Sequence, residues 1–176
     1  MYGIVKQSRS SIWVYSELGK GSTFKIYLPA AAGATEAPLP AVDAHALRGT
    51  ETVLVVEDQP DVRRLIEKTL SRYGYTVFTA TNGPEATAMA QAYEGPIHVM
   101  LTDVILPGAS GRETARQVVA TRPSMRVLYM SGYTDDAIVQ HGVLEPGLAF
   151  IQKPFTAEAL ARRIREVLAS DSPPLF

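Results

Sequence analysis

The chain has 176 residues, of which 46% are hydrophobic and 20% charged, and its formal net charge is -1. This composition suits one well-formed globular core with an appendage, and the near-neutral charge argues against a dedicated nucleic-acid surface. The absence of cysteine excludes disulfides, thiolate metal sites and cysteine nucleophiles, and no apolar run approaches the roughly 18–20 residues of a membrane span.

The first thirty residues contain two alternating apolar and polar runs, which predict a β-hairpin. SIWVYSE and TFKIYLP are typical of paired strands, and LGKG lies between them as the turn. The Gly-Lys-Gly-Ser-Thr run looks like a phosphate-binding loop, but such a loop needs a hydroxyl residue after its lysine and a helix beyond it. Gly21 follows Lys20, and the next segment is a strand, so we expect no nucleotide site here.

Residues 30–50 are rich in alanine and proline and short of large apolar residues. The prolines interrupt any long helix, and the segment lacks the alternation of a strand. We therefore interpret it as a linker between an N-terminal segment, residues 1–29, and a larger domain, residues 51–170. A short tail, residues 171–176, follows that domain.

The larger domain alternates strand and helix patterns five times. The strand patterns are TVLVVED, YTVFTA, HVMLTD, RVLYMSG and AFIQKP. Helix patterns follow them at residues 60–73, 84–93, 112–121, 135–141 and 157–169. The first and last helices are expected to turn these apolar residues inward: Val62, Leu65, Ile66 and Leu70, and Leu160, Ile164, Val167 and Leu168. Five such units predict an α/β fold with a doubly wound five-stranded parallel sheet, covered by helices on both faces.

Polar side chains follow four of these strands at one edge of the predicted sheet. They are Glu57, Asp58, Asp103, Ser131 and Lys153. Ligands of open α/β sheets bind at this carboxyl edge. Three crowded carboxylates repel one another unless a cation compensates, and oxygen ligands of this kind suit Mg²⁺. A lysine and a hydroxyl beside the ion would receive phosphoryl oxygens, and the nearest carboxylate could act as a nucleophile that forms an acyl phosphate.

The segments VLVVEDQPDVR, LTDVILPGASG, YMSGYTDD and FIQKPF resemble the signature segments of the response-regulator receiver domain of two-component signalling. The resemblance covers nearly the whole larger domain and implies the flavodoxin-like receiver fold. It implies that Asp103 is the phosphoacceptor and that Glu57 and Asp58 form an acidic pocket. It further implies that Asp58 and Asp103, with the backbone carbonyl of Ile105, coordinate Mg²⁺.

The same resemblance assigns roles to the remaining residues. Ser131 would hydrogen-bond the phosphoryl group and move as a switch residue, and Lys153 would pair with that group. The Lys153–Pro154 peptide would be cis, which proline at the second position makes energetically feasible. Phe150 stands where the family has a switch aromatic residue; a plain core phenylalanine on a buried strand is the equally weighted alternative.

YGIVKQS, IWVYSE and GSTFKIYLP together resemble the extreme C-terminus of a histidine-kinase ATP-binding domain, with its last helix and final hairpin. The fold would thus carry an N-terminal helix–hairpin appendage, although Arg9 and Ser10 replace glycines that are common at the turn between them. The implied parent protein is a hybrid sensor histidine kinase. This part of it is expected to be cytoplasmic, and a membrane anchor could lie elsewhere in the longer chain. The ATP site and the phosphoacceptor histidine would lie upstream of Met1, so we expect this chain not to bind ATP.

The sequence therefore predicts a receiver module that catalyses transfer of a phosphoryl group from phosphohistidine to itself. The donor would be a histidine kinase or a histidine phosphotransfer protein. Phosphorylation would switch the face formed by the fourth helix, fifth strand and fifth helix, and self-association is expected through that face or through the hairpin. Only DSPPLF follows Ser170, so no nucleic-acid output is expected.

Two alternatives to this function stay open at the level of the sequence. One is a receiver fold that acts as a protein-interaction module without phosphorylation. The other is a phosphohydrolase with an aspartyl nucleophile, of the haloacid dehalogenase type. Such enzymes usually need a second aspartate two residues after the nucleophile, where Ile105 stands in this chain.

Overall fold

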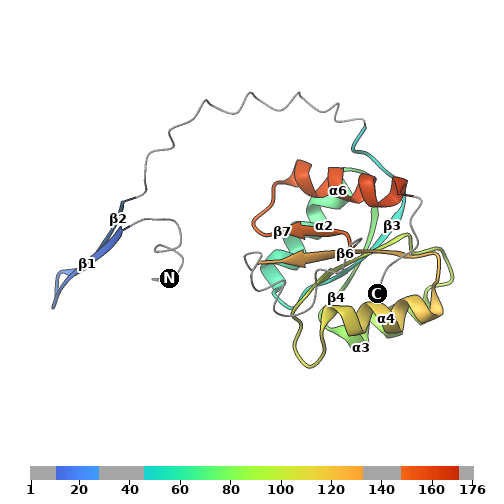
Figure 1. Cartoon of the computed structure of the whole chain (residues 1–176), viewed down its shortest axis with the longest axis horizontal. Coiled ribbons are helices and arrows are strands. Elements are labelled where there is room, and N and C mark those ends of the chain that lie inside the picture. Colours follow the sequence, from blue (N-terminus) through green and yellow to red (C-terminus); the bar gives the residue numbers. More distant parts are fainter. Residues whose placement is uncertain (1–10, 28–45, 133–147, 171–176) are drawn as a thin grey trace. The chain divides into compact units, whose positions relative to one another are not determined.

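A computed structural model describes residues 11–27, 46–132 and 148–170 (Figure 1). The chain forms two compact units, Met1–Ala41 and Val42–Phe176. Several predictions fall outside the described residues: the helical end at YGIVKQS, the weak helix at 135–141, the tail and most of the linker.

The N-terminal unit contains the predicted antiparallel hairpin, formed by β1 (Ser11–Glu17) and β2 (Gly21–Tyr27) and drawn in blue in Figure 1. Gly19 and Gly21 have φ angles of +78° and +99°, a region that glycine adopts without steric cost. The Gly-Lys-Gly run thus forms the turn of this hairpin and the first residue of β2. The hairpin leaves large apolar side chains exposed: Trp13, Val14, Tyr15, Leu18, Phe24, Ile26 and Tyr27.

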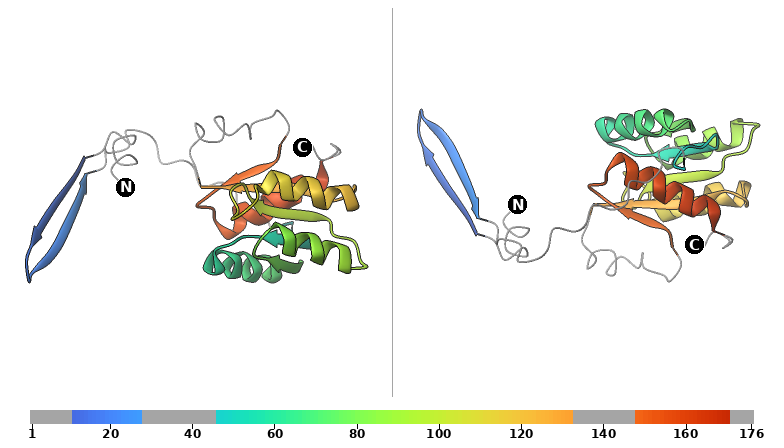
Figure 2. Two further views of the ribbon diagram at one scale, coloured as in Figure 1. Left: turned by 90° about the horizontal axis from the view of Figure 1, so that it is seen from below. Right: turned by 90° about the horizontal axis from the view of Figure 1, so that it is seen from above.

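The second unit confirms the predicted α/β fold. Its five parallel strands have the order β4-β3-β5-β6-β7. They are β3 (Thr52–Val56), β4 (Thr76–Ala80), β5 (Val99–Asp103), β6 (Arg126–Ser131) and β7 (Phe150–Gln152). The described helices are α2 (Pro60–Arg72), α3 (Gly83–Ala92), α4 (Gly111–Thr121) and α6 (Ala157–Ala169). Helices α2 and α6 cover one face of the sheet and α3 and α4 the other (Figures 1 and 2).

Strand β3 shows why the sheet has two separate cores. Successive side chains of a strand point to opposite faces, so Val53 and Val55 enter one apolar cluster while Leu54 and Val56 enter the other. All five residues of β3 are buried, as expected for an inner strand of a parallel sheet with helices on both sides. Within the described ranges, none of the helices has the length and apolar character needed to cross a membrane.

The inward faces of the helices are confirmed except at one residue. Ile66 and Leu70 of α2 are buried and Val62 packs partly against the same core, but Leu65 is 64% exposed. The prediction that Leu65 faces inward is therefore wrong. Consecutive helix residues lie about 100° apart, so Leu65 falls on the flank of the face that Ile66 defines. The predicted inward residues of α6 are buried or half-buried.

Tyr129 on β6 is only 1% exposed, and within the described ranges no group forms a hydrogen bond with its buried hydroxyl. Because a buried unsatisfied hydroxyl costs free energy, Tyr129→Phe is expected to keep the stability or raise it by about 1 kcal/mol in urea denaturation. Tyr75→Phe is the matched control, since its hydroxyl donates to the Leu47 carbonyl at 3.2 Å. That control should lose about 1 kcal/mol. Equal losses in both variants would contradict the prediction.

Candidate functional site

The polar residues predicted to meet at the sheet edge come from the ends of four neighbouring strands. Glu57 and Asp58 directly follow β3, Asp103 is the last residue of β5, Ser131 is the last of β6 and Lys153 follows β7. Since the strands are parallel, their carboxyl ends share one edge. Each of the three carboxylates offers an oxygen, and these oxygens all lie within 4.8 Å of one another.

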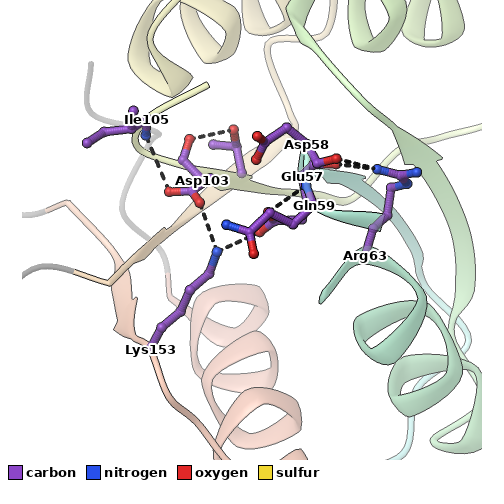
Figure 3. Close-up of polar contacts among 8 residues, drawn as sticks. Glu57, Asp58, Gln59, Arg63, Asp103, Ile105 and Lys153 are labelled. Atoms are coloured by element: carbon purple, nitrogen blue, oxygen red, sulfur yellow. Dashed lines mark hydrogen bonds and ion pairs between the residues drawn. The ribbon is translucent and has the colours of Figure 1, made fainter. Parts of the chain in front are cut away.

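Lys153 holds two of these carboxylates together (Figure 3). Its ammonium donates to Glu57 Oε2 at 2.6 Å and to Asp103 Oδ2 at 2.8 Å. Glu57 is fully buried, and burial raises the pKa of its carboxyl above the ordinary 4.5 although Lys153 acts in the opposite direction. Burial alone would lower the pKa of Lys153, but its hydrogen bonds to Asp103 and Glu57 raise it. The lysine therefore supplies a fixed positive charge.

The Asp103 carboxylate is fixed through both oxygens but stays accessible. Its Oδ2 binds Lys153, and its Oδ1 accepts a hydrogen bond from the Ile105 amide at 3.3 Å. The side chain keeps 16% of its surface exposed. The Thr102 hydroxyl donates to the Asp103 carbonyl at 3.0 Å. This arrangement presents an accessible carboxylate next to a bound ammonium group.

Asp58 differs from the other two acidic residues. Glu57 accepts hydrogen bonds from Lys153 and from the Gln59 amide, at 3.2 Å for the latter. In the part of the chain that the structure describes, no donor contacts the Asp58 carboxylate. Its oxygens are available to a ligand, and a hard divalent cation such as Mg²⁺ fits an all-oxygen donor set of this kind.

Ser131 and Phe150 lie next to this cluster. Ser131 is 4% exposed, and its carbonyl accepts a hydrogen bond from the Lys153 amide at 2.7 Å. Phe150 pairs with Tyr129 across β6 and β7 and packs, half-buried, against an apolar core. The Lys153–Pro154 peptide is cis, as the resemblance implied. The switch roles of Ser131 and Phe150 stay predictions.

Two residues that support the site were not identified from the sequence. Arg63 of α2 donates to the backbone carbonyls of Glu57 and Asp58. Gly111, the first residue of α4, approaches the Asp103 carbonyl so closely that an added Cβ would lie 1.9 Å from its oxygen. The sequence contains a signal for each of these two residues. Gly111 is a glycine at the start of a helix, and Arg63 is an arginine in the first helical turn after an acidic pair.

A five-stranded parallel α/β sheet with three carboxylates and a lysine at its carboxyl edge defines a receiver-type domain. Comparison with known families supports this class, because the family described as response regulator receiver domain matches residues 53–165. The chain therefore belongs to the response regulator receiver family. The acidic pocket of Glu57, Asp58 and Asp103 is typical of the phosphoacceptor site of such domains.

Individual relatives extend this assignment. The chain is 35% identical to the sensor kinase CckA of Brucella abortus over 96% of its own length, but it spans only 19% of that protein. It is 29% identical to the response regulator receiver protein CpdR of the same organism, over 66% of this chain and 95% of CpdR. The solved receiver domain of the hybrid histidine kinase CckA superposes with a TM-score of 0.57 at 31% identity, covering 66% of this chain and 98% of that domain.

Proposed function

We propose that this chain is a phosphoacceptor receiver module of a two-component phosphorelay. The observation that supports this most is the Lys153 ammonium bound between Glu57 and Asp103 at the carboxyl edge of a receiver sheet. Asp103 combines an accessible carboxylate with a cationic neighbour that can bind phosphoryl oxygens. An Asp103 oxygen attacks phosphorus, the phosphorus–nitrogen bond of the phosphohistidine donor breaks, and the electron pair of that bond returns to the imidazole.

The residues around Asp103 prepare this transfer. Asp58 and Asp103, with the backbone carbonyl of Ile105, would hold Mg²⁺, and Glu57 would support the site through Lys153. A bound Mg²⁺ would offset the negative charge of the transferring phosphoryl group. Lys153 acts on the same charge from the β7 side, and Ser131 is proposed to bind a phosphoryl oxygen. The site is thus built for charge compensation more than for proton transfer.

The proposed output is a shift of Ser131 that biases the face containing β7 and α6. Phe150, the first residue of β7, is the candidate switch residue, and its carbonyl accepts a hydrogen bond from Arg163 of α6 at 3.1 Å. Through that bond, a change at Phe150 would reach α6 directly. A histidine kinase or a histidine phosphotransfer protein is the proposed partner.

We infer that the parent protein is a hybrid histidine kinase. The similarity to sensor kinase CckA extends over 96% of this chain and so includes residues outside the receiver domain. The hairpin of β1 and β2 would then be the end of an ATP-binding domain, and its exposed apolar side chains would be covered there. A two-stranded hairpin has little stability by itself, which agrees with this role.

Phosphorylation by acetyl phosphate in Mg²⁺ tests the proposed function directly. The wild type is expected to gain the mass of one phosphoryl group, and Asp103→Asn should gain none because the amide is not a nucleophile of this kind. Asp61→Asn, at an exposed carboxylate of α2, is the matched control and should be labelled like the wild type. An unlabelled wild type, or labelled Asp103→Asn, contradicts the proposal. An unlabelled wild type would favour the interaction-module alternative.

A further inference from the structure

The loop that contains Glu57 and Asp58 lacks the local capping bond found at the other helices that the structure describes. Helices begin with free amides that a side-chain acceptor normally satisfies. Three of the four described helices follow this rule; their caps are Asn82, Ser110 and Thr156. Gln59, before α2, makes no such bond, and Pro60 has no amide to offer. The position of this loop must therefore depend on other contacts.

Arg63 supplies two of those contacts, beside the hydrogen bonds from the Glu57 amide to the Ala80 carbonyl at 3.1 Å and from the Gln59 amide to Glu57 Oε1 at 3.2 Å. Its Nη1 donates to the Glu57 carbonyl at 2.7 Å and to the Asp58 carbonyl at 3.1 Å. Figure 3 shows its side chain on the far side of the acidic pair from Lys153. Both acceptors are backbone oxygens, so the guanidinium holds the main chain of the two acidic residues and leaves their carboxylates to face the site.

A carboxylate of α3 interacts electrostatically with the same guanidinium. Glu85 accepts hydrogen bonds from the Thr81 hydroxyl at 2.5 Å and from the Thr81 amide at 2.7 Å. These hydrogen bonds lower the pKa of Glu85, and the positive charge of Arg63 adds to the effect. Glu85 is thus an ionised neighbour that attracts the Arg63 side chain. The neighbouring Arg64 instead forms an exposed ion pair with Asp61 at 2.8 Å.

We propose that Arg63 is a positioning residue of the cation site, which fixes Glu57 and Asp58 by binding their backbone carbonyls. The proposal rests on the proposed function, because it assumes that Asp58 and Asp103 bind a divalent cation. Groups that orient metal ligands from outside the coordination shell typically change metal affinity about 10–100-fold when removed. The positive charge of Arg63 alone repels a cation. When Arg63 is removed, loss of positioning therefore predicts weaker Mg²⁺ binding, whereas loss of repulsion predicts tighter Mg²⁺ binding.

The test compares Arg63→Ala with Arg64→Ala in the unphosphorylated full chain. Titration calorimetry measures the Mg²⁺ dissociation constant, and circular dichroism measures the melting temperature in the presence of EDTA. Arg63→Ala is expected to raise the dissociation constant about tenfold. Arg64→Ala removes an identical side chain from the next position, where the arginine forms only an exposed ion pair with Asp61. The Mg²⁺ dissociation constant of Arg64→Ala should therefore match that of the wild type.

The outcomes of this titration distinguish a positioning role of Arg63 from a role in stability alone. Unchanged or tighter Mg²⁺ binding by Arg63→Ala overturns the positioning role, and a lower melting temperature with unchanged affinity would assign Arg63 to stability alone. A wild type that binds no Mg²⁺ overturns the proposed cation site together with this inference. If Arg63→Ala does not fold, Arg63→Met keeps an apolar stem without the hydrogen-bond donors, and an unchanged dissociation constant in that variant overturns the proposal.

Discussion

Replacing Lys153 with methionine is expected to destabilise the folded chain by about 3 kcal/mol at pH 7 when EDTA removes divalent cations. Methionine keeps an unbranched side chain but removes the ammonium that binds Glu57 and Asp103 at 2.6 and 2.8 Å. Glu57 is fully buried, so its carboxylate would stay in the interior without a compensating charge. Urea denaturation of both proteins in the same buffer measures the difference.

The size of this loss should depend on pH through Glu57. Burial already raises the pKa of Glu57 above 4.5 in the presence of Lys153, and removing the lysine raises it further. A carboxyl whose pKa is raised by folding adds stability below its unfolded pKa and loses it as the pH rises through its folded pKa. The variant should therefore approach the wild type below pH 4.5 and fall behind it as the pH rises towards neutrality.

Two further variants separate the charge effect from the loss of packing. Lys153→Met combined with Glu57→Gln leaves no buried unpaired carboxylate at Glu57, so this pair should recover most of the lost stability at pH 7. Lys68→Met changes an exposed lysine of α2 and should alter stability by less than about 0.5 kcal/mol. A single Lys153→Met variant with the stability of the wild type from acid to neutral pH would contradict the compensating role of Lys153.

The location of the site could be predicted because the ends of the buried strands can be recognised in the sequence. Strands β3, β5 and β6 are buried on both faces, and so they appear as nearly continuous apolar runs that end at a polar residue. Parallel topology then brings these ends together. Lys153 contacts Glu57 across 96 positions of the sequence, because the parallel sheet places the carboxyl ends of β3 and β7 at the same edge.

The contacts that support the site could not be predicted from the pattern of residue types. They depend on how each helix is rotated about its axis and on how closely the backbone segments approach one another. Arg63 and Arg64 are adjacent and chemically identical, yet a turn of about 100° per residue sends one to the site loop and the other to solvent. The error at Leu65 has the same origin, since an apolar residue on the flank of α2 looks like part of its buried face. The burial of the Tyr129 hydroxyl also could not be predicted from the apolar run of β6.

Gly111→Ala is the second substitution for which we expect a large effect. An added Cβ would lie 1.9 Å from the Asp103 carbonyl oxygen and 3.0 Å from its carbon, and both are backbone atoms that cannot rotate away. The Gly111 amide also donates to the Val104 carbonyl at 2.9 Å, which ties the start of α4 to the same segment. Relieving the clash requires a backbone shift, and we expect a loss of about 3 kcal/mol, at the upper end of the usual cost of overpacking.

The same shift should slow the proposed phosphorylation of Asp103. Its carboxylate is held by Ile105 on one oxygen and Lys153 on the other, and both bonds depend on where the Asp103 backbone lies. A displacement of about 1 Å can lower a reaction rate about 100-fold, so labelling by acetyl phosphate should slow by that order in the folded fraction of Gly111→Ala. Mass spectrometry over time, with the folded fraction taken from circular dichroism, measures this rate.

Gly108→Ala is the matched control, because Gly108 lies in the loop that leads into α4 but an added Cβ there meets nothing within 4 Å. Its φ of +83° disfavours alanine, so this variant should lose about 1 kcal/mol and keep its labelling rate. Equal labelling rates for the two variants would show that the close approach of α4 does not position Asp103. Slow labelling of Gly111→Ala beside normal labelling of Gly108→Ala would instead show that the position of Asp103 depends on its close backbone contact with Gly111, where no side chain fits.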